Sequence, residues 1–240
     1  MGKKIFYKPA LNDHALEVLH LIKKNNSFLI TSHIGLDGDA LGSELALARI
    51  LKKMGKKVQI LNDSAIPLAY QFLPGVEKIR SFPQTQPAIH DAVIILDIGK
   101  FDRAGTLKNT ISLKNDTIIN IDHHKSNKGF GTASLIDSSI SSTGELLFEF
   151  FKWAGLPVDK TTALLLYVSI LTDTGRFTYD NTGAQTHKNI GELLETGKIR
   201  TNVVASRIYR NLTCGQMELY KRALQSLTYT KNKKIAYITL

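Results

Sequence analysis

Apolar residues recur along the first half of the chain in short runs that alternate with stretches of helical spacing. Runs at residues 27–32, 58–61, 92–96 and 117–121 predict strands, and the last two have the continuous apolar character of buried parallel strands. Helical spacing predicts helices over residues 12–24 and 40–54, with Gly55 just past the end of the second one. Alternating strands and helices predict βαβ units, so we expect an α/β fold in which helices flank a parallel sheet.

The second half of the chain has a mainly helical pattern. Helices are predicted over residues 143–153, 161–171, 186–195, 202–210 and 217–227, and a short helix fits near residues 68–72. Residues 231–234 predict a hairpin turn before an apolar strand at residues 235–240. Because a lone hairpin is only marginally stable in water, we interpret residues 228–240 as the start of a truncated C-terminal domain. A first domain of residues 1–195 and a helical linker of residues 196–227 would precede it. The alternative is an edge strand that pairs back onto the first domain.

The composition is that of an ordinary globular protein. Of the 240 residues, 43% are hydrophobic and 22% are charged, and the chain is long enough to bury a sizeable core. No apolar run reaches the roughly 18 residues of a membrane span. The N-terminus, Met1-Gly2-Lys3-Lys4, does not lead into the apolar stretch of a secretory signal. Cys214 is the single cysteine, which excludes an intramolecular disulfide framework and fits a reducing compartment. We therefore expect a soluble, cytoplasmic protein without a membrane partner.

The formal net charge is +10, and the excess lies in the first sixty and the last sixty residues. A basic balance of this kind suits polyanionic partners such as nucleic acids, nucleotides or phosphates. A solvated basic surface without a specific partner is the alternative interpretation.

Aspartate and histidine residues follow apolar segments at four places along the chain. They are His33, Asp37, Asp39, Asp97, Asp122, His123, His124 and Asp173. In an open parallel sheet, ligands gather outside the carboxyl ends of the strands, so we expect the first three places to converge. Burying several carboxylates together is costly because they repel each other, and two divalent cations would remove that cost. Aspartate oxygens and histidine nitrogens without cysteine suit Mn²⁺ or another borderline-hard ion.

Each of these residues, considered alone, could have a structural role in place of metal binding. Asp39 stands where the N-cap acid of a helix would stand, with Ala40 as the first helical residue. Gly35 and Gly38 would let the loop bend so that Asp37 and Asp39 point at different ions. It is the convergence of four segments that favours a two-metal site over a set of structural aspartates.

The order of these motifs resembles the DHH phosphoesterase superfamily over nearly the whole chain. The family triplet corresponds to Asp122-His123-His124, and the first motif corresponds to residues 37–43, Asp-Gly-Asp-Ala-Leu-Gly-Ser. Residues 171–177, followed by Asn181-Thr182, are similar to the nanoRNase and pAp-phosphatase subfamily, which is related to RecJ-type exonucleases. The resemblance implies a metal-dependent phosphoesterase that hydrolyses short oligoribonucleotides, 3′-phosphoadenosine 5′-phosphate, or both.

The resemblance also implies how the ligands are divided between two divalent cations, with Mn²⁺ the expected ion. The first ion would be bound by His33 and Asp37, the second by Asp39, His123 and Asp173, and both by a bridging Asp97.

Four further residues receive roles from the same resemblance. Asp122 would orient a histidine, and His124 would contact phosphate or protonate the leaving group. Arg103 and Arg176 would bind phosphate groups, and a surface ion pair is the alternative for either arginine. A water activated by two metals would attack phosphorus in line, so no covalent enzyme intermediate is needed.

The chain departs from the family pattern at three places. Gly35-Leu36 stands where a proline usually precedes the family's aspartate, and Lys100 stands where an acid is common. The family's second domain, DHHA1, grips the substrate, and this chain ends where that domain should be starting.

Two other functions stay open at this point. One is a pyrophosphatase-like phosphohydrolase, which shares the metal motifs, and the other is an inactive, truncated nucleotide-binding module. The sequence contains no Gly-x-Ser-x-Gly motif, which argues against a serine hydrolase. The expected partners are short oligonucleotides or phosphorylated nucleotides, and self-association as a homodimer is left open.

Overall fold

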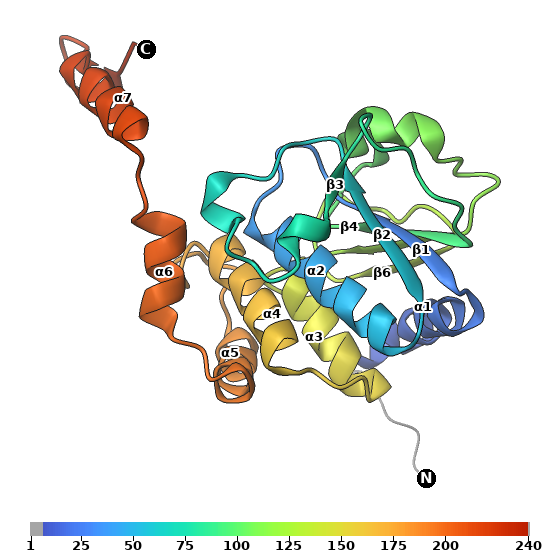
Figure 1. Cartoon of the computed structure of the whole chain (residues 1–240). Coiled ribbons are helices and arrows are strands. Elements are labelled where there is room, and N and C mark those ends of the chain that lie inside the picture. Colours follow the sequence, from blue (N-terminus) through green and yellow to red (C-terminus); the bar gives the residue numbers. More distant parts are fainter. Residues whose placement is uncertain (1–6, 240) are drawn as a thin grey trace. The chain divides into compact units, whose positions relative to one another are not determined.

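The computed structural model describes residues 7–239, and a six-stranded sheet organises most of them (Figure 1). The strands lie in the order β3-β2-β1-β4-β5-β6, and every neighbouring pair is parallel. The strands are β1 Ser27–Thr31, β2 Lys57–Asn62, β3 Arg80–Ser81, β4 Ala92–Leu96, β5 Ile118–Asp122 and β6 Ala133–Ile136. This arrangement confirms the α/β fold with a parallel sheet flanked by helices.

The strand order reverses at the centre of the sheet, between β1 and β4. From β1 the chain moves outward to β2 and β3, and it then returns to the other side of β1 to add β4, β5 and β6. The carboxyl ends of β1, β4 and β5 therefore lie side by side. A doubly wound sheet leaves a crevice at such a switch point, because the connections leave the two strand ends in opposite directions.

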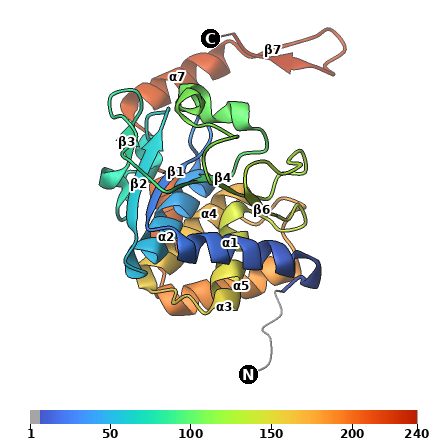
Figure 2. The ribbon, with the colours of Figure 1, turned by 90° about the vertical axis from the view of Figure 1, so that its right-hand side faces the viewer.

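Helices α2, α3 and α4 pack together beside the sheet (Figure 1), and α1 packs against β6 (Figure 2). The helices of this part are α1 Asn12–Lys24, α2 Gly38–Lys53, α3 Thr143–Ala154, α4 Lys160–Asp173 and α5 Ala184–Gly197. Helix α4 contacts α2, α3 and α5, which explains why its sequence is apolar nearly all round. A helix buried in this way has a fixed position, and its last residue is Asp173.

A 3-10 helical segment, η4 Phe101–Thr110, connects β4 to β5 and packs on the sheet. Apolar residues of η4 join residues of β1, β2, β4 and β5 in one buried cluster. Its members are Leu29, Leu61, Val93, Ile95, Ile98, Ala104, Leu107, Ile111 and Ile118. The same strands are therefore covered on both faces, which accounts for the continuous apolar runs of β4 and β5.

The elements that the sequence pattern did not reveal include η4, β3 and β6. β3 has two residues and β6 has four, which is too short for an alternation of apolar and polar residues to stand out. The paired strand β6 follows a glycine-containing loop in which Gly131 adopts a positive φ of 86°. A Cβ atom there would lie 2.9 Å from the carbonyl oxygen of Ile118, so this loop must pass very close to β5.

Residues 200–240 form a second unit, which is described here by itself. It contains α6 Thr201–Tyr209, α7 Cys214–Gln225 and the antiparallel hairpin of β7 Thr228–Tyr229 and β8 Ala236–Tyr237. The predicted hairpin is present, but the predicted strand at residues 235–240 is too long, because pairing covers Ala236 and Tyr237 alone among the described residues and Leu240 lies outside them. The strand β8 pairs with its hairpin partner β7. The division into domains at residues 195 and 227 stays a prediction.

Among the described residues, no helix is both long enough and apolar enough to cross a membrane.

The approach of α2 to α4 depends on a glycine. At Gly42, a Cβ atom would lie 2.5 Å from the carbonyl oxygen of Leu165 and 2.9 Å from the Cβ of Ser169. Both are atoms of the neighbouring helix that cannot rotate away. The missing side chain of Gly42 therefore lets α2 carry Asp39 up to the end of α4.

Replacing Gly42 by alanine should force these helices apart. We expect Gly42→Ala to lower the free energy of unfolding by about 1–3 kcal/mol, which is typical of overpacking. The measurement is urea unfolding followed by circular dichroism. Gly191→Ala is the matched control, because a Cβ atom at that position of α5 meets no atom within 4 Å, so helix propensity should leave it neutral or more stable. Equal effects of the two substitutions would contradict the packing argument.

Candidate metal centre

Three adjacent strand ends and two helix ends deliver the side chains of the site. His33 follows β1, Asp97 follows β4, and Asp122 is the last residue of β5. Asp37 and Asp39 stand at the start of α2, and Asp173 stands at the end of α4. The structure therefore brings together segments that are far apart in the sequence, at the switch point of the sheet.

One group of side chains consists of His33, Asp37 and Asp97. The Nε2 atom of His33 lies 3.4 Å from Asp97 Oδ2 and 3.7 Å from Asp37 Oδ2. The other ring nitrogen, Nδ1, lies 2.9 Å from the carbonyl oxygen of Ile34 and donates to it. This contact fixes the ring and leaves Nε2 directed at the two carboxylates, which is the usual arrangement of a metal-binding histidine.

A second group consists of Asp39, His123 and Asp173. The Nε2 atom of His123 lies 3.4 Å from Asp173 Oδ2 and 3.7 Å from Asp39 Oδ2. Within each group, one ligand atom per residue can be chosen so that all lie within 4.8 Å of one another. Each set of donor atoms is thus already gathered around a space of the size that a small cation would occupy.

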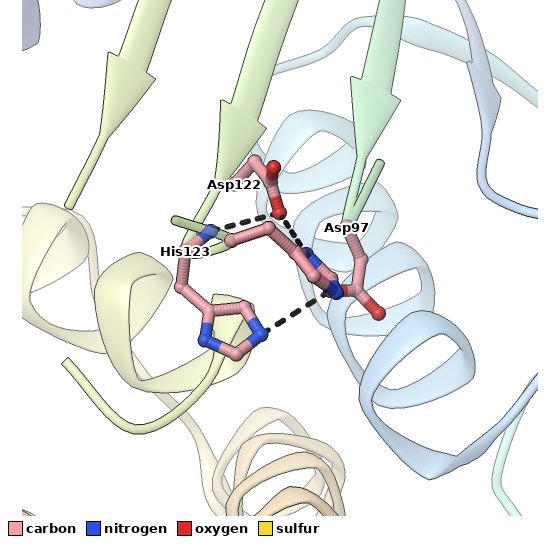
Figure 3. A group of neighbouring side chains, drawn as sticks. Asp97, Asp122 and His123 are labelled. Carbon is pink, nitrogen blue, oxygen red and sulfur yellow. Dashed lines mark hydrogen bonds and ion pairs between the residues drawn. The ribbon is translucent and has the colours of Figure 1, made fainter. Parts of the chain in front are cut away.

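Asp97 faces both groups, with a different oxygen toward each histidine. Oδ2 is the atom near His33, whereas Oδ1 lies 3.6 Å from Nε2 of His123. Figure 3 shows Asp97 and His123 at the ends of neighbouring strands, with the imidazole ring turned toward the carboxylate. A carboxylate that offers one oxygen to each of two sites is the arrangement expected of a bridging ligand.

Asp39 is 1% exposed and does not cap helix α2. The alternative interpretation, in which Asp39 is the N-cap residue of this helix, was therefore wrong. Asp37 is the N-cap residue and accepts a hydrogen bond from the Ala40 amide at 3.0 Å. Asp39 lies inside the first turn and accepts hydrogen bonds from the hydroxyls of Ser43 and Ser169. It also accepts two from backbone amides at the start of α3, those of Thr143 at 2.8 Å and Gly144 at 3.0 Å.

These partners of Asp39 are the functional residues that the sequence analysis missed. Ser43 could have been found, because it stands four residues after Asp39 and therefore on the same face of a helix. The start of α3 carries a Ser142-x-x-Glu145 pattern that marks a helix N-terminus, where amides attract anions. Nothing local connects that pattern or Ser169 with Asp39.

Asp122 is fully buried and holds the two histidines that follow it. Its Oδ1 accepts from the backbone amide of His123 at 2.8 Å (Figure 3). The same oxygen accepts from Nδ1 of His124 at 2.7 Å. Its Oδ2 accepts from the side-chain amide of Asn127 at 2.7 Å. Because Nδ1 of His124 carries the proton given to Asp122, Nε2 is the nitrogen left for another partner.

The two arginines lie beside these groups, on exposed positions of the connecting segments. Arg103 belongs to η4, and its carbonyl oxygen accepts from the Ile34 amide at 2.8 Å, next to His33. Arg176 follows Asp173 by three residues and adopts a positive φ of 64°. Neither arginine belongs to the groups of donor atoms described above.

Two acids of the centre, Asp39 and Asp173, hold their protons more strongly than ordinary carboxylates do. Burial raises the pKa of Asp39 well above its usual range, and the negative charges of Asp97 and Asp173 raise it further. Burial also raises the pKa of Asp173 to about 6; the charge of His123 opposes this and that of Asp97 adds to it. Crowded carboxylates shift in this direction because their charged forms repel each other.

Hydrogen bonds to carboxylates also raise the pKa values of two histidines, His33 and His124. Burial lowers the pKa of His33, but hydrogen bonds to Asp37 and Asp97 outweigh burial and raise the pKa to about 10. The hydrogen bond to Asp122 raises the pKa of His124 above its usual range. Without cations, protons therefore balance the charge of this acidic centre.

The donor set fits divalent metal ions. It combines carboxylate oxygens with histidine nitrogens, and hydrogen bonds to the surrounding protein fix several of the donors, as in established metal sites. The cost of placing Asp39 beside Asp97 would disappear with two positive ions between them. The residues present thus form a centre able to hold metal.

Comparison with known proteins identifies the family. The model of the DHH family, N-terminal domain, matches residues 27–170, a span that contains every strand of the parallel sheet and most of the centre. The chain belongs to the DHH family. Asp173 lies just beyond the matched region, at the end of the last helix that this region includes in part.

Relatives of this DHH chain include two proteins that carry the same name, bifunctional oligoribonuclease and PAP phosphatase NrnA. The one from Thermus thermophilus is 32% identical over 168 residues, which are 70% of this chain and 49% of that protein. The one from Bacillus subtilis is 27% identical over 182 residues, which are 75% of this chain and 56% of that protein. The chain thus spans about half the length of these curated relatives.

A solved structure shares nearly the whole fold. The crystal structure of an exopolyphosphatase-related protein from Bacteroides fragilis superposes on 95% of this chain with a TM-score of 0.88 and 26% sequence identity. The superposition covers 69% of that protein's chain.

The raised pKa values predict how pH and metal act together. An acid with a raised pKa binds more protons in the folded than in the unfolded chain, so its contribution to stability is lost as pH rises. For Asp173 that loss runs from the ordinary value of 3.8 to about 6, and for His33 it runs from 6.5 to about 10. The metal-free chain should therefore lose stability as pH rises from 5 to 8.

Metal binding should show the opposite dependence, because the ligands must first release these protons. We expect Mn²⁺ to raise the melting temperature more at pH 8 than at pH 5.5, measured by scanning calorimetry with Mn²⁺ or with EDTA. Asp173→Asn removes one of the titrating ligands and should flatten the profile. A stabilisation by Mn²⁺ that is equal at both pH values would contradict the assignment of the centre.

Proposed function

We propose that this chain is a metal-dependent phosphoesterase that acts on short oligoribonucleotides, on 3′-phosphoadenosine 5′-phosphate, or on both. The observation that carries the proposal is the position of Asp97, which offers one oxygen to each of two groups of ligands. The same reaction class is named for relatives from Thermus thermophilus and Bacillus subtilis. The first ion would be held by His33, Asp37 and Asp97, and the second by Asp39, Asp97, His123 and Asp173.

The centre would hold two divalent cations, and Mn²⁺ fits its mixed oxygen and nitrogen donors. The cations would supply Lewis acidity and would lower the pKa of water, so that hydroxide is available as the nucleophile near neutral pH. Asp97 fixes the distance between the two groups of ligands, because both depend on one carboxylate. The hydroxyl of Thr143 donates to Oδ1 of Asp97 at 3.1 Å and restrains its rotation. Preorganised ligands of this kind need no rearrangement when the substrate arrives.

His124 is placed to give a proton to the departing oxygen. Its Nδ1 donates to Asp122, and this contact raises the pKa of His124, so the ring is protonated more readily at neutral pH. The proton on Nε2 is then the one available for the leaving group, which departs as an alcohol once the P–O bond breaks. Asp122 positions the ring and remains an acceptor throughout.

Arg103 and Arg176 would neutralise the charge of the substrate. Each lies on a segment that follows a ligand residue by a few positions, and each side chain is exposed. A guanidinium group can donate two parallel hydrogen bonds to one phosphate. The pair would thus bind the phosphate groups that lie outside the metal centre.

The test is the replacement of the shared carboxylate. Asp97→Asn removes the charge but keeps the shape, so metal-dependent hydrolysis of 3′-phosphoadenosine 5′-phosphate and of trinucleotide RNA should fall by about a hundredfold or more. Release of phosphate and of mononucleotide in Mn²⁺ is the measurement. Asp102→Asn is the matched control, because Asp102 is an exposed aspartate on η4 that pairs with Lys108.

Three results would overturn this proposal. Full activity of Asp97→Asn would show that the shared carboxylate has no catalytic role. Hydrolysis of pyrophosphate in place of both nucleotide substrates would instead establish a pyrophosphatase-like function. Binding of Mn²⁺ without turnover of any phosphoester would establish a nucleotide-binding module.

A further inference from the structure

A cavity of about 540 Å³ opens within the part of the chain before residue 200. Sites for small molecules usually have volumes of about 300–1,000 Å³. The lining residues come from the N-terminal segment, the loops after β5 and β6, the start of α3, the loop between α4 and α5, and the start of α5. None of the eight residues assigned to the metal centre in the sequence lines this cavity.

The cavity adjoins the metal centre through three of its lining residues. Lys125 directly follows His124, at the end of β5. Asn181 donates from its side-chain amide to the carbonyl oxygen of Asp173 at 3.1 Å. Glu145 stands one residue after Gly144, whose amide holds Asp39. The cavity wall and the metal centre are therefore built from the same three chain segments.

Hydrogen bonds hold the wall of the cavity in place. Glu145 is fully buried and accepts from Ser141, Thr186 and Asn189. On the opposite segment, the hydroxyl of Tyr7 donates to the buried carboxylate of Asp137. The aromatic ring of Tyr7 is thereby fixed at the edge of the cavity, so the space is formed before any ligand arrives.

Three polar groups of the wall are available to a ligand. The ammonium group of Lys125, the hydroxyl of Ser138 and the carboxylate of Asp180 make no hydrogen bond or ion pair with any residue that the structure describes. Lys125 suits a phosphate oxygen, because an ammonium group donates to anions. Asp180 suits hydroxyl groups, because an ionised carboxylate is an acceptor only.

We propose that this cavity binds the nucleoside part of a phosphorylated nucleotide, in a position next to the phosphate that the metal centre holds. The base packs against the ring of Tyr7, the ribose hydroxyls donate to Asp180, and Lys125 binds a phosphate oxygen. The proposal rests on the proposed function and adds to it a binding site that distinguishes nucleotides from inorganic phosphates, which would leave the cavity empty.

Gly183 offers a way to fill the cavity without disturbing the backbone. It lines the cavity at the start of α5 with a φ of −105°, which any residue adopts, and a Cβ atom there meets nothing within 4 Å. Gly183→Leu therefore places an apolar side chain in the open space. Gly191→Leu is the matched control, because Gly191 has equally open surroundings on the same helix but does not line the cavity.

The experiment measures binding, so it does not depend on turnover. Adenosine 5′-monophosphate, ribose 5-phosphate and inorganic phosphate are titrated into the full chain by isothermal calorimetry, with Mn²⁺ and again with EDTA. Because stacking on an aromatic ring favours binding of a base, the adenine nucleotide should bind about tenfold more tightly than ribose 5-phosphate. This preference should disappear in Gly183→Leu and persist in Gly191→Leu.

A second pair of variants covers the case in which Gly183→Leu does not fold. Lys125→Gln should weaken binding of adenosine 5′-monophosphate severalfold and reduce its dependence on salt. Lys128→Gln should change neither, because Lys128 is an equally exposed lysine that does not line the cavity. Equal effects of the two lysine variants would overturn the proposal.

Other outcomes separate this inference from the proposed function. Equal binding of adenosine 5′-monophosphate and ribose 5-phosphate by the unaltered chain would overturn the inference, and so would a preference that survives in Gly183→Leu. A preference that disappears in Gly183→Leu, found together with an absence of hydrolysis, would support the cavity and refute the phosphoesterase. Hydrolysis without a preference for the adenine nucleotide would support the phosphoesterase and refute the cavity as a nucleoside site.

Discussion

Mutual repulsion among buried carboxylates is the constraint on which the rest of this structure depends. Asp39 and Asp97 are 1% and 2% exposed, and both lie within reach of His123. Two such charges can be buried together only if hydrogen bonds, protons or cations compensate them. The chain supplies four donors to Asp39 alone, two of them amides at the start of α3. Protons on His33 and on the acids complete the compensation in the metal-free state, and divalent ions would replace those protons.

The surrounding fold brings these donors together. The switch point of the sheet places the ends of β1, β4 and β5 next to one another, so three ligand segments meet without any long connection. The fourth segment arrives from a different direction, at the end of α4. Its position depends on the close contact between α2 and α4, which the glycine at position 42 permits. Packing in the helical layer therefore decides how far Asp173 lies from Asp39 and His123, the other members of the second group.

In the proposed function, the metal centre and the cavity each recognise a different part of the substrate. A centre of carboxylates and histidines binds cations and, through them, phosphate, but it has no means of distinguishing one phosphate compound from another. The cavity, with its aromatic edge and its available lysine and carboxylate, supplies contacts that an inorganic phosphate cannot use. Both lie within the first 199 residues, and the chain spans about half the length of its curated relatives. Specificity for a nucleoside would then begin in the DHH domain itself.

The sequence by itself determined the parallel sheet, most of its helices and the eight acidic and histidine residues, because apolar periodicity and strand-end position are local properties. Only the tertiary structure decided which residue caps α2: Asp37 does so, and Asp39 turns inward, because its four donors come from three different helices. Tertiary structure also decided the contacts of Ser169 and Gly42 and the walls of the cavity. Contacts between helices more than a hundred residues apart leave no periodic mark in the sequence, since each partner follows the pattern of its own helix.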